Sequence, residues 1–400
     1  MSLFLEVIPV SEAVEVVRRV ARPPRSEEVA IEDALYRVLA EDVLADIDIP
    51  GFDRSTVDGY AVAAADTTGA SEAIPAMLGC LGRVGMGSAD GCSISPGLCR
   101  YIPTGGALPR GADAVVMIEH VEEIGGDLLV RRPVAPGENV VFQGEDFRAG
   151  QVVLERGRVL SPRDIGVAAA VGAGRVSVVT PPVIGVISTG NELVRTDRVP
   201  GPGEVRDANS YLVGAFVAER GCLPIHLGIV RDERDALDEA ITVALARCDA
   251  VLVSGGSSKD ERDNTAAVIA DLGEVLVHGI AIAPGKPTII GTAEGKPVIG
   301  LPGHPASAYV VLVAIVDHLL AAMQKTTVAR RTLHARLTEN IPSARGREDY
   351  VRVRVREGEA MPVFGKSGLL NTLVQSEGLV RIPASSEGFE AGEDVEVILW

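Results

Sequence analysis

The chain has 400 residues, of which 46% are hydrophobic and 4% aromatic, and its 38 basic and 55 acidic side chains give a formal charge of −17. Because so much apolar surface can be buried, the composition excludes a disordered chain and allows about two to four domains. The acidic balance excludes non-specific binding to nucleic acid or to anionic membranes, which both need a basic surface, but it allows a small anionic ligand in a local pocket.

The N-terminal residues and the cysteines favour a cytoplasmic protein. The first six residues have neither the basic region nor the long apolar core of a signal peptide. The five cysteines are scattered, which argues against a disulfide framework or a structural zinc site. The longest apolar stretch, 306–323, is interrupted by Asp317 and His318 and is predicted to be a buried helix rather than a membrane span.

The first part of the chain predicts two short helical regions around a β domain. Apolar residues at helical spacing predict a helix over 10–22, followed by a second short helix over 33–39. Residues 52–143 are rich in glycine, proline and short valine and isoleucine runs, which is typical of β structure. A serine followed by proline then predicts a helix over 161–172.

From about residue 175 strands and helices alternate, which predicts a parallel α/β sheet covered on both faces. The expected strands are 183–187, 225–230, 250–253, 275–282, 288–290 and 298–301. The expected helices are 210–220, 232–247, 264–272 and 304–323. Valines and arginines alternate over 351–356, and residues 330–400 therefore predict a small β-barrel or sandwich.

Four loops of the predicted α/β sheet carry candidate chemistry. They follow strands, and in an open parallel sheet ligands bind at the carboxyl ends of the strands. Glycines let the backbone approach a ligand, hydroxyl groups add hydrogen bonds, and helix N-termini attract anions. Together the loops indicate a site for a phosphate-bearing ligand, although each is a weak signal alone. They are 188–192, 231–232, 254–258 and 301–305.

Acidic side chains accompany these loops. Carboxylates beside a phosphate site suggest Mg²⁺, which takes one or two carboxylates together with substrate oxygens. Asp232 could equally be a helix cap, and Asp260 a solvated loop charge. Glu192 and Asp263 are harder to explain in structural terms.

Polar turns also occur in and beside the predicted β domain, at 53–62, 101–106 and 144–147. Turn chemistry alone could explain any of them. The residue pattern does not place them near the edge of the α/β sheet.

As a set, these motifs resemble the molybdopterin molybdenumtransferase family, which comprises MoeA and the gephyrin E domain. The matching segments follow the family's order over nearly the whole chain, and together they are highly specific. They are DRSTVDGYAV (53–62), IPTGGALPRGADAVVMIE (102–119), GEDFRAG (144–150), ISTGNEL (187–193), VSGGSSKDERD (253–263), APGKP (283–287) and LPGHPASA (301–308).

The resemblance implies a multidomain α/β plus β protein with four domains. These are an elongated domain in two segments (1–45 and 145–174), an inserted β domain (46–144), a three-layer molybdopterin-binding α/β domain (175–327) and a C-terminal β-barrel (328–400). It also implies a homodimer whose site lies between the α/β domain of one chain and the β domain of the other. The implied reaction inserts molybdate or tungstate into adenylylated molybdopterin, with Mg²⁺-dependent release of AMP. The adenylyltransferase of the same pathway is a further implied partner.

The resemblance also assigns roles position by position. Asp58, Thr104 and Asp146 match the contribution of the partner chain, and Glu192, Asp232 and Asp263 match acidic residues that would position Mg²⁺ or polar parts of the ligand. The pterin and phosphate cradle corresponds to Ser188, Thr189, Gly190, Gly255, Gly256 and Ser258. Lys286 would offset phosphate charge, Pro302 and Pro305 would shape the last loop, and Arg347 and Ser367 would hold the oxyanion.

This chain departs from the family pattern at several of these loops. Ala283 and Asp260 stand where the family usually has lysine and glycine, and Asn191 and His304 where it usually has aspartate and asparagine. Gly279 stands where the family often has a second lysine, so one or two cations are missing from an anion site. We hypothesise that Lys259, beside the third loop, supplies the replacement charge.

Two other functions stay open at this point. A molybdopterin adenylyltransferase, or a related nucleotide pyrophosphatase, would share the α/β unit, but the polar β cluster and the C-terminal barrel argue against it. A non-catalytic scaffold, which gephyrin is in part, is the other alternative, and the chain shows neither a linker nor an appended binding domain in support of it.

Overall fold

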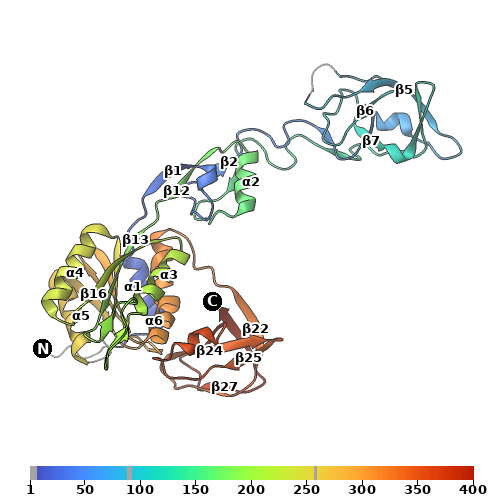
Figure 1. Cartoon of the computed structure of the whole chain (residues 1–400). Coiled ribbons are helices and arrows are strands. Elements are labelled where there is room, and N and C mark those ends of the chain that lie inside the picture. The colour runs from blue at the N-terminus through green and yellow to red at the C-terminus, as the bar shows by residue number, and fades with distance from the viewer. Residues whose placement is uncertain (1–6, 88–91, 256–258) are drawn as a thin grey trace.

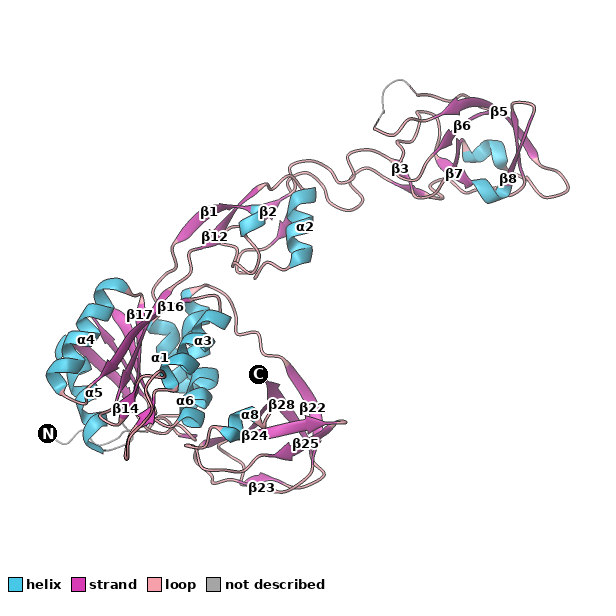
Figure 2. Cartoon of the chain, viewed as in Figure 1, coloured by secondary structure: helices cyan, strands magenta, loops and turns pink. Residues whose placement is uncertain are grey.

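The computed structural model describes residues 7–87, 92–255 and 259–400, except for the side chains of 259–263. The molecule is elongated (Figure 1). An α/β sheet and a small barrel lie together at one end, a second β unit lies at the other end, and a narrow region joins them. Helices are concentrated in the α/β unit, whereas the small barrel and the distal β unit are mostly strands (Figure 2).

The narrow region is built from two chain segments that run past each other. Strand β1 (Ser26–Ala30) pairs antiparallel with β12 (Arg175–Val179), and β2 (Val43–Leu44) with β11 (Val152–Leu154). Helix α2 (Pro162–Ala170) covers them, as predicted. Because β12 belongs to this region, the region extends past the expected limit at residue 174.

The predicted helix over 33–39 is wrong. A single 3-10 turn, η1 (Ile31–Asp33), is present, after which Tyr36 adopts a left-handed backbone with φ 62°. Leu39 then forms a β-bridge with Val178 of the neighbouring segment. A seven-residue helix has little stability of its own, so pairing with another segment decides the local structure.

The distal unit is a six-stranded sheet in the order β7-β4-β6-β5-β9-β8, which confirms the β structure predicted for 52–143. Its strands are β4 (Gly59–Val62), β5 (Ala76–Arg83), β6 (Leu98–Ile102), β7 (Ala114–Met117), β8 (Val121–Ile124) and β9 (Asp127–Val130). A short ribbon of β3 (Arg54–Ser55) and β10 (Val140–Val141) and the 3-10 turns η2 (Ala64–Thr67) and η3 (Ile118–His120) complete it. Mostly aliphatic side chains, with tyrosines and cysteines in the larger cluster, form its two small cores.

The α/β unit contains a six-stranded sheet in the order β16-β13-β17-β21-β20-β18. Its strands are β13 (Val183–Thr189), β16 (Leu223–Val230), β17 (Ala250–Gly255), β18 (Gly273–His278), β20 (Ile289–Ala293) and β21 (Lys296–Leu301). A small separate ribbon pairs β14 (Leu193–Val194) with β15 (Val205–Arg206). Its helices are α3 (Asn209–Glu219), α4 (Arg234–Arg247), α5 (Lys259–Leu272), α6 (Pro305–Val311), the π-helical turn η4 (Leu312–Val316) and α7 (Asp317–Met323).

The expectation of a fully parallel sheet holds only for β16, β13, β17 and β21. Strands β20 and β18 run antiparallel to their neighbours. The reason is a tight hairpin between β20 and β21, whose two turn residues, Glu294 and Gly295, both have positive φ. Two consecutive positive φ angles match the twist of an antiparallel ribbon.

The apolar segment Pro305–Met323 forms one helical stretch that lies in the core of the α/β unit. By length and hydropathy it could cross a membrane, but 83% of its apolar window is buried inside the protein. This agrees with the predicted buried helix. The N-terminal helix α1 (Val10–Val20) packs into the same core, so the expected assignment of residues 1–45 to the elongated domain does not hold for this helix.

The C-terminal unit is a closed barrel of five strands, in which β24 pairs with both β25 and β26 and closes the ring. The strands are β22 (Thr332–Leu337), β24 (Glu348–Arg356), β25 (Glu359–Pro362), β26 (Gly378–Ile382) and β28 (Asp394–Leu399). Short strands β19 (Ile282–Ala283), β23 (Ile341–Pro342) and β27 (Gly388–Phe389) and helix α8 (Asn371–Val374) flank it. Since β19 pairs with β24, the barrel is joined by backbone hydrogen bonds to the segment that follows β18.

Candidate functional site

The predicted loops do meet at one edge of the α/β sheet. Thr189 at the end of β13 is in register with Val230 of β16 and Gly255 of β17, and Ser254 is in register with Leu301 of β21. A cavity of about 450 Å³ opens at this edge. We call it the strand-edge cavity, and its lining includes Ser188, Thr189, Glu192, Asp207, Asn209, Ser254, Gly255 and Pro305.

Close backbone approach explains two glycines of this edge. A Cβ on Gly255 would lie 2.1 Å from the carbonyl oxygen of Thr189, and one on Gly190 would lie 2.8 Å from the carboxylate of Glu192. Glycine at these positions therefore lets neighbouring strand ends touch and lets an acidic side chain fold back over the loop. Glu192 is exposed at the cavity wall.

Asp232 is a cross-link between two loops and does not cap a helix. Helix α4 begins at Arg234, with Glu233 at the N-cap position. The Asp232 carboxylate accepts a hydrogen bond from the Thr189 hydroxyl at 2.5 Å and one from the backbone N–H of Asn191 at 3.1 Å. Of the two interpretations left open by the sequence, the structure excludes the cap and places this carboxylate at the sheet edge.

Two further residues, Asp207 just before α3 and Asn209 at its first position, line the strand-edge cavity, and the sequence analysis missed both. The buried Ser188 hydroxyl donates to Asp207 at 2.9 Å. The side-chain N–H groups of Asn209 donate to the Ser254 hydroxyl and to the Gly303 carbonyl, each at 2.8 Å. Asn209 is only 8% exposed, and its carbonyl oxygen has no hydrogen-bond partner. Polar residues at the start of a predicted helix resemble a helix cap, so the sequence pattern does not distinguish them as site residues.

Part of the predicted cradle lies outside the described residues. Gly256 and Ser258 belong to this part, and the side chains of Lys259, Asp260 and Asp263 are likewise not described. Their assigned roles, including charge replacement by Lys259, stay predictions. Within 7–87, 92–255 and 259–400, leaving aside the side chains of 259–263, no group of three or more His, Cys, Asp or Glu side chains could hold a metal ion.

A second cavity, of about 620 Å³, lies between the α/β unit and the barrel. We call it the barrel-side cavity. Its lining includes the predicted residues Lys286, Pro302, Arg347 and Ser367, together with Arg345, which the sequence analysis missed. Ala283 also lines it. The cavity therefore has three cationic side chains, Lys286, Arg345 and Arg347.

The guanidinium of Arg347 is held in place by a neighbouring acid. Its Nε lies 2.8 Å from the Asp349 carboxylate and its Nη2 lies 3.3 Å from the other carboxylate oxygen. The Ser343 hydroxyl donates to the same carboxylate at 2.8 Å. The ion pair and the hydrogen bond hold the guanidinium beside Asp349, and its remaining N–H groups can face a ligand.

The two cavities touch at one point. Of the described residues, only Gly303 and His304 line both of them. Pro305 lines the strand-edge cavity and Pro302 the barrel-side cavity, so the last predicted loop forms the wall between them.

The remaining predicted residues lie elsewhere in the chain. Gly59 of β4 is in register with Ile102 of β6, so Asp58 and Thr104 meet at one edge of the distal sheet. The Asp58 carboxylate accepts hydrogen bonds from the backbone N–H of Thr104 at 2.8 Å and from its hydroxyl at 3.1 Å. Asp146 is exposed where the distal unit joins the narrow region. This part of the chain is far from the α/β sheet (Figure 1), so one chain does not bring all predicted site residues together.

Comparison with known families first defines the class of protein. Residues 8–172 match the MoeA N-terminal region (domain I and II), residues 185–322 match a molybdopterin binding domain, and residues 334–400 match the MoeA C-terminal region (domain IV). These matches define a multidomain molybdopterin-binding protein.

Individual relatives narrow this class to one family. A molybdopterin biosynthesis protein of Methanocaldococcus jannaschii is 36% identical over 100% of both chains. The molybdopterin molybdenumtransferase of Bacillus subtilis is 34% identical over 98% of this chain and 94% of its own. A crystal structure of the molybdopterin biosynthesis moeA protein from Pyrococcus horikoshii OT3 superposes with a TM-score of 0.89 at 33% identity, covering 99% of this chain and 100% of that one. The chain belongs to the MoeA family of molybdopterin molybdenumtransferases.

Proposed function

We propose that the chain is a molybdopterin molybdenumtransferase of molybdenum cofactor biosynthesis. The reaction inserts molybdate, or tungstate, into adenylylated molybdopterin, with Mg²⁺-dependent release of AMP. Family membership over the full length supports this function over an adenylyltransferase or a scaffold, because the relatives match the distal unit and the barrel as well as the α/β unit.

One observation carries the proposal: two cavities of different chemistry share a wall. The strand-edge cavity offers hydroxyl groups, carboxylates and an amide, which suit a pterin with its phosphate linkage. The barrel-side cavity offers Lys286, Arg345 and Arg347, which suit a tetrahedral oxyanion. A reaction that joins a pterin dithiolene to an oxyanion needs these two sites side by side.

The side-chain carbonyl oxygen of Asn209, which has no hydrogen-bond partner, supports the proposal that an organic ligand binds in the strand-edge cavity. Buried polar atoms are nearly always hydrogen-bonded, and an exception calls for a missing partner. The Gly303 carbonyl can only accept, so the Asn209 group that faces it must be the amino group. The carbonyl oxygen of Asn209 is therefore available to an N–H group such as those of a pterin ring.

The acidic residues at this edge of the sheet fit Mg²⁺ that is shared with substrate. Glu192 lines the strand-edge cavity, Asp232 holds the neighbouring Thr189, and Mg²⁺ commonly binds one or two carboxylates and substrate phosphate oxygens without a full protein cage. Asp263 is the third residue that we assign to this role. When bound, the ion would neutralise phosphate charge on the substrate.

The distant position of Asp58, Thr104 and Asp146 supports a homodimer in which these residues join the strand-edge cavity of the partner chain. Large exposed apolar side chains on the narrow region provide surface for such an association. They include Leu35, Tyr36, Leu44, Ile47, Val152 and Val159. We also propose that the protein is cytoplasmic and that it associates with the adenylyltransferase that supplies its substrate. We propose a division into four domains, in which helix α1 belongs with the α/β domain.

The test is a direct assay of the purified protein with adenylylated molybdopterin, Mg²⁺ and either molybdate or tungstate. We expect AMP release that depends on both the oxyanion and Mg²⁺, and the anion that supports faster release is the preferred metal source. Absence of oxyanion-dependent AMP release with both anions would contradict the proposed function.

A further inference from the structure

His304 occupies the wall between the two cavities. It lies at the N-cap position of α6 and, with Gly303, is one of the two described residues that line both cavities. The barrel lies beside this end of α6 (Figure 2). A side chain at this position can contact a ligand that moves from one cavity toward the other.

The wall is held from both sides. On the barrel side, the Ser367 hydroxyl lies 2.9 Å from Nδ1 of His304, and the backbone N–H of Ala306 donates to the Ser367 carbonyl at 3.2 Å. On the other side, Asn209 donates to the Gly303 carbonyl. The imidazole is thus fixed through Nδ1, and Nε2 is the ring nitrogen left for a ligand.

The charges around His304 differ between its two sides. Lys286, Arg345 and Arg347 line the barrel-side cavity, whereas Glu192, Asp207 and Arg206 line the strand-edge cavity. Among the described lining residues, His304 is the only histidine and there is no cysteine. It is therefore the one imidazole donor among the described residues that line this wall.

We propose that His304 binds the oxyanion through Nε2–H at the passage between the cavities. This inference rests on the proposed function and deepens it. With Nδ1 held by the Ser367 hydroxyl, the ring can donate Nε2–H to a dianion, and a hydrogen bond to an ionised acceptor is stronger than one between neutral groups.

The experiment measures direct binding of molybdate by calorimetry, and the KM for molybdate in the AMP-release assay, for the wild type and for variants of His304 under the same conditions. His304→Ala should weaken molybdate binding about tenfold, because the Nε2–H donor to the anion is lost. His304→Gln, whose side-chain amide can also donate an N–H group, should restore part of this affinity. Ser367→Ala should also weaken binding, because the ring is no longer held.

His334 provides a matched control on the surface of the barrel, where it pairs with Asp394 and is 69% exposed. His334→Ala should keep the wild-type affinity for molybdate. A His304→Ala variant that binds molybdate as tightly as the wild type would overturn the inference, and it would leave the proposed function standing as long as the wild type releases AMP. Loss of oxyanion-dependent AMP release in the wild type would instead overturn the proposed function.

Discussion

At the scale of single residues, the position of a carboxylate decides between a structural and a functional interpretation. Asp232 follows a strand and precedes a helix, so the sequence leaves its role open. In the structure its carboxylate accepts from Thr189 and from the backbone of Asn191, and the helix begins two residues later. The carboxylate is therefore held at the edge of the sheet by two loops, which excludes the helix cap.

Asp232→Asn should lower kcat about 100-fold, because the amide keeps the shape of the side chain but loses the charge that we assign to Mg²⁺. The measurement is AMP release as a function of Mg²⁺ concentration, with thermal unfolding of the same samples. Asp235→Asn is the matched control, since Asp235 lies in the first turn of the same helix. Equal activity of the two variants would remove Asp232 from the site.

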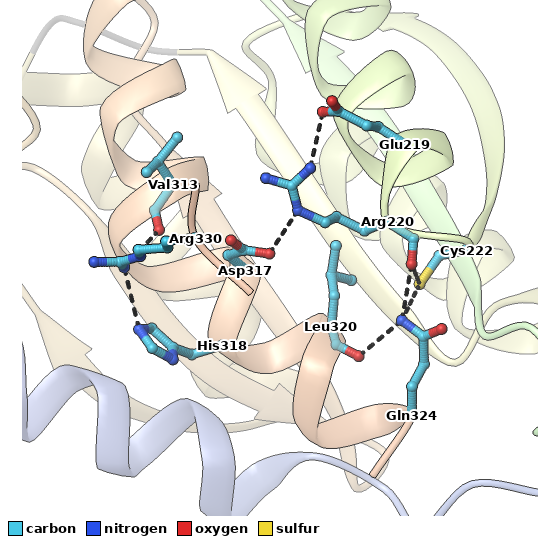
Figure 3. Close-up of polar contacts among 9 residues, drawn as sticks. All are labelled: Glu219, Arg220, Cys222, Val313, Asp317, His318, Leu320, Gln324 and Arg330. Atoms are coloured by element: carbon cyan, nitrogen blue, oxygen red, sulfur yellow. Dashed lines mark hydrogen bonds and ion pairs between the residues drawn. The ribbon is translucent and has the colours of Figure 1, made fainter. Parts of the chain in front are cut away.

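At the scale of elements, the end of the long core helix is tied to its surroundings by a polar network (Figure 3). Asp317 of α7 pairs with Arg220, which follows α3, at 2.8 Å, and Arg220 also pairs with Glu219 at 2.9 Å. Gln324 donates to the backbone carbonyls of Arg220 and Leu320. These contacts fix helix α7 against helix α3 beneath the sheet.

His318 lies in the same network, between two arginines. Arg18 of α1 approaches one ring nitrogen at 3.3 Å and Arg330 the other at 3.4 Å, and Arg330 also donates to the carbonyl of Val313 in the π-helical turn. Burial, with the two guanidinium groups, lowers the pKa of His318 to about 4. The folded protein therefore holds this imidazole neutral.

A neutral buried histidine makes stability depend on pH. In the unfolded chain His318 has an ordinary pKa of about 6.5, so below this pH the unfolded state binds a proton that the folded state excludes. The free energy of unfolding should fall by about 1–2 kcal/mol from about pH 7 to about pH 5, after allowance for solvent screening.

His318→Gln should remove this part of the pH dependence. The measurement is urea unfolding of wild type, His318→Gln and the surface control His334→Gln at several pH values. A His318→Gln variant that loses as much stability on acidification as the wild type would contradict the assignment.

The sequence predicts elements whose signal is local. Strand–loop–helix alternation is local, so the residue pattern is enough to place Thr189, Gly255 and Pro302 at one sheet edge. The antiparallel β20, by contrast, depends on a hairpin at Glu294 and Gly295 that lacks the usual asparagine–glycine signal. The contacts of His304 with Ser367 and of Asn209 with Gly303 join residues 63 and 94 positions apart, and no local pattern reports such contacts.

At the scale of the whole molecule, the elongated shape separates two groups of acidic residues. Asp58 lies at the edge of the distal sheet and Glu192 at the edge of the α/β sheet, and the two sheets lie at opposite ends of the elongated molecule (Figure 1). Such a separation is explained if each chain lends its distal unit to the cavity of a partner, as in an isologous dimer. The central claim is then that a complete site contains residues from two chains.

Mixing two inactive variants tests this claim most directly. Asp58→Ala and Glu192→Ala, each purified as a homodimer, should show little AMP release alone. After co-expression and random pairing, half of the dimers are mixed, and each mixed dimer contains one intact site. The mixture should therefore recover about a quarter of the wild-type activity. Recovery of no activity, although mixed dimers have formed, would contradict a site shared between chains.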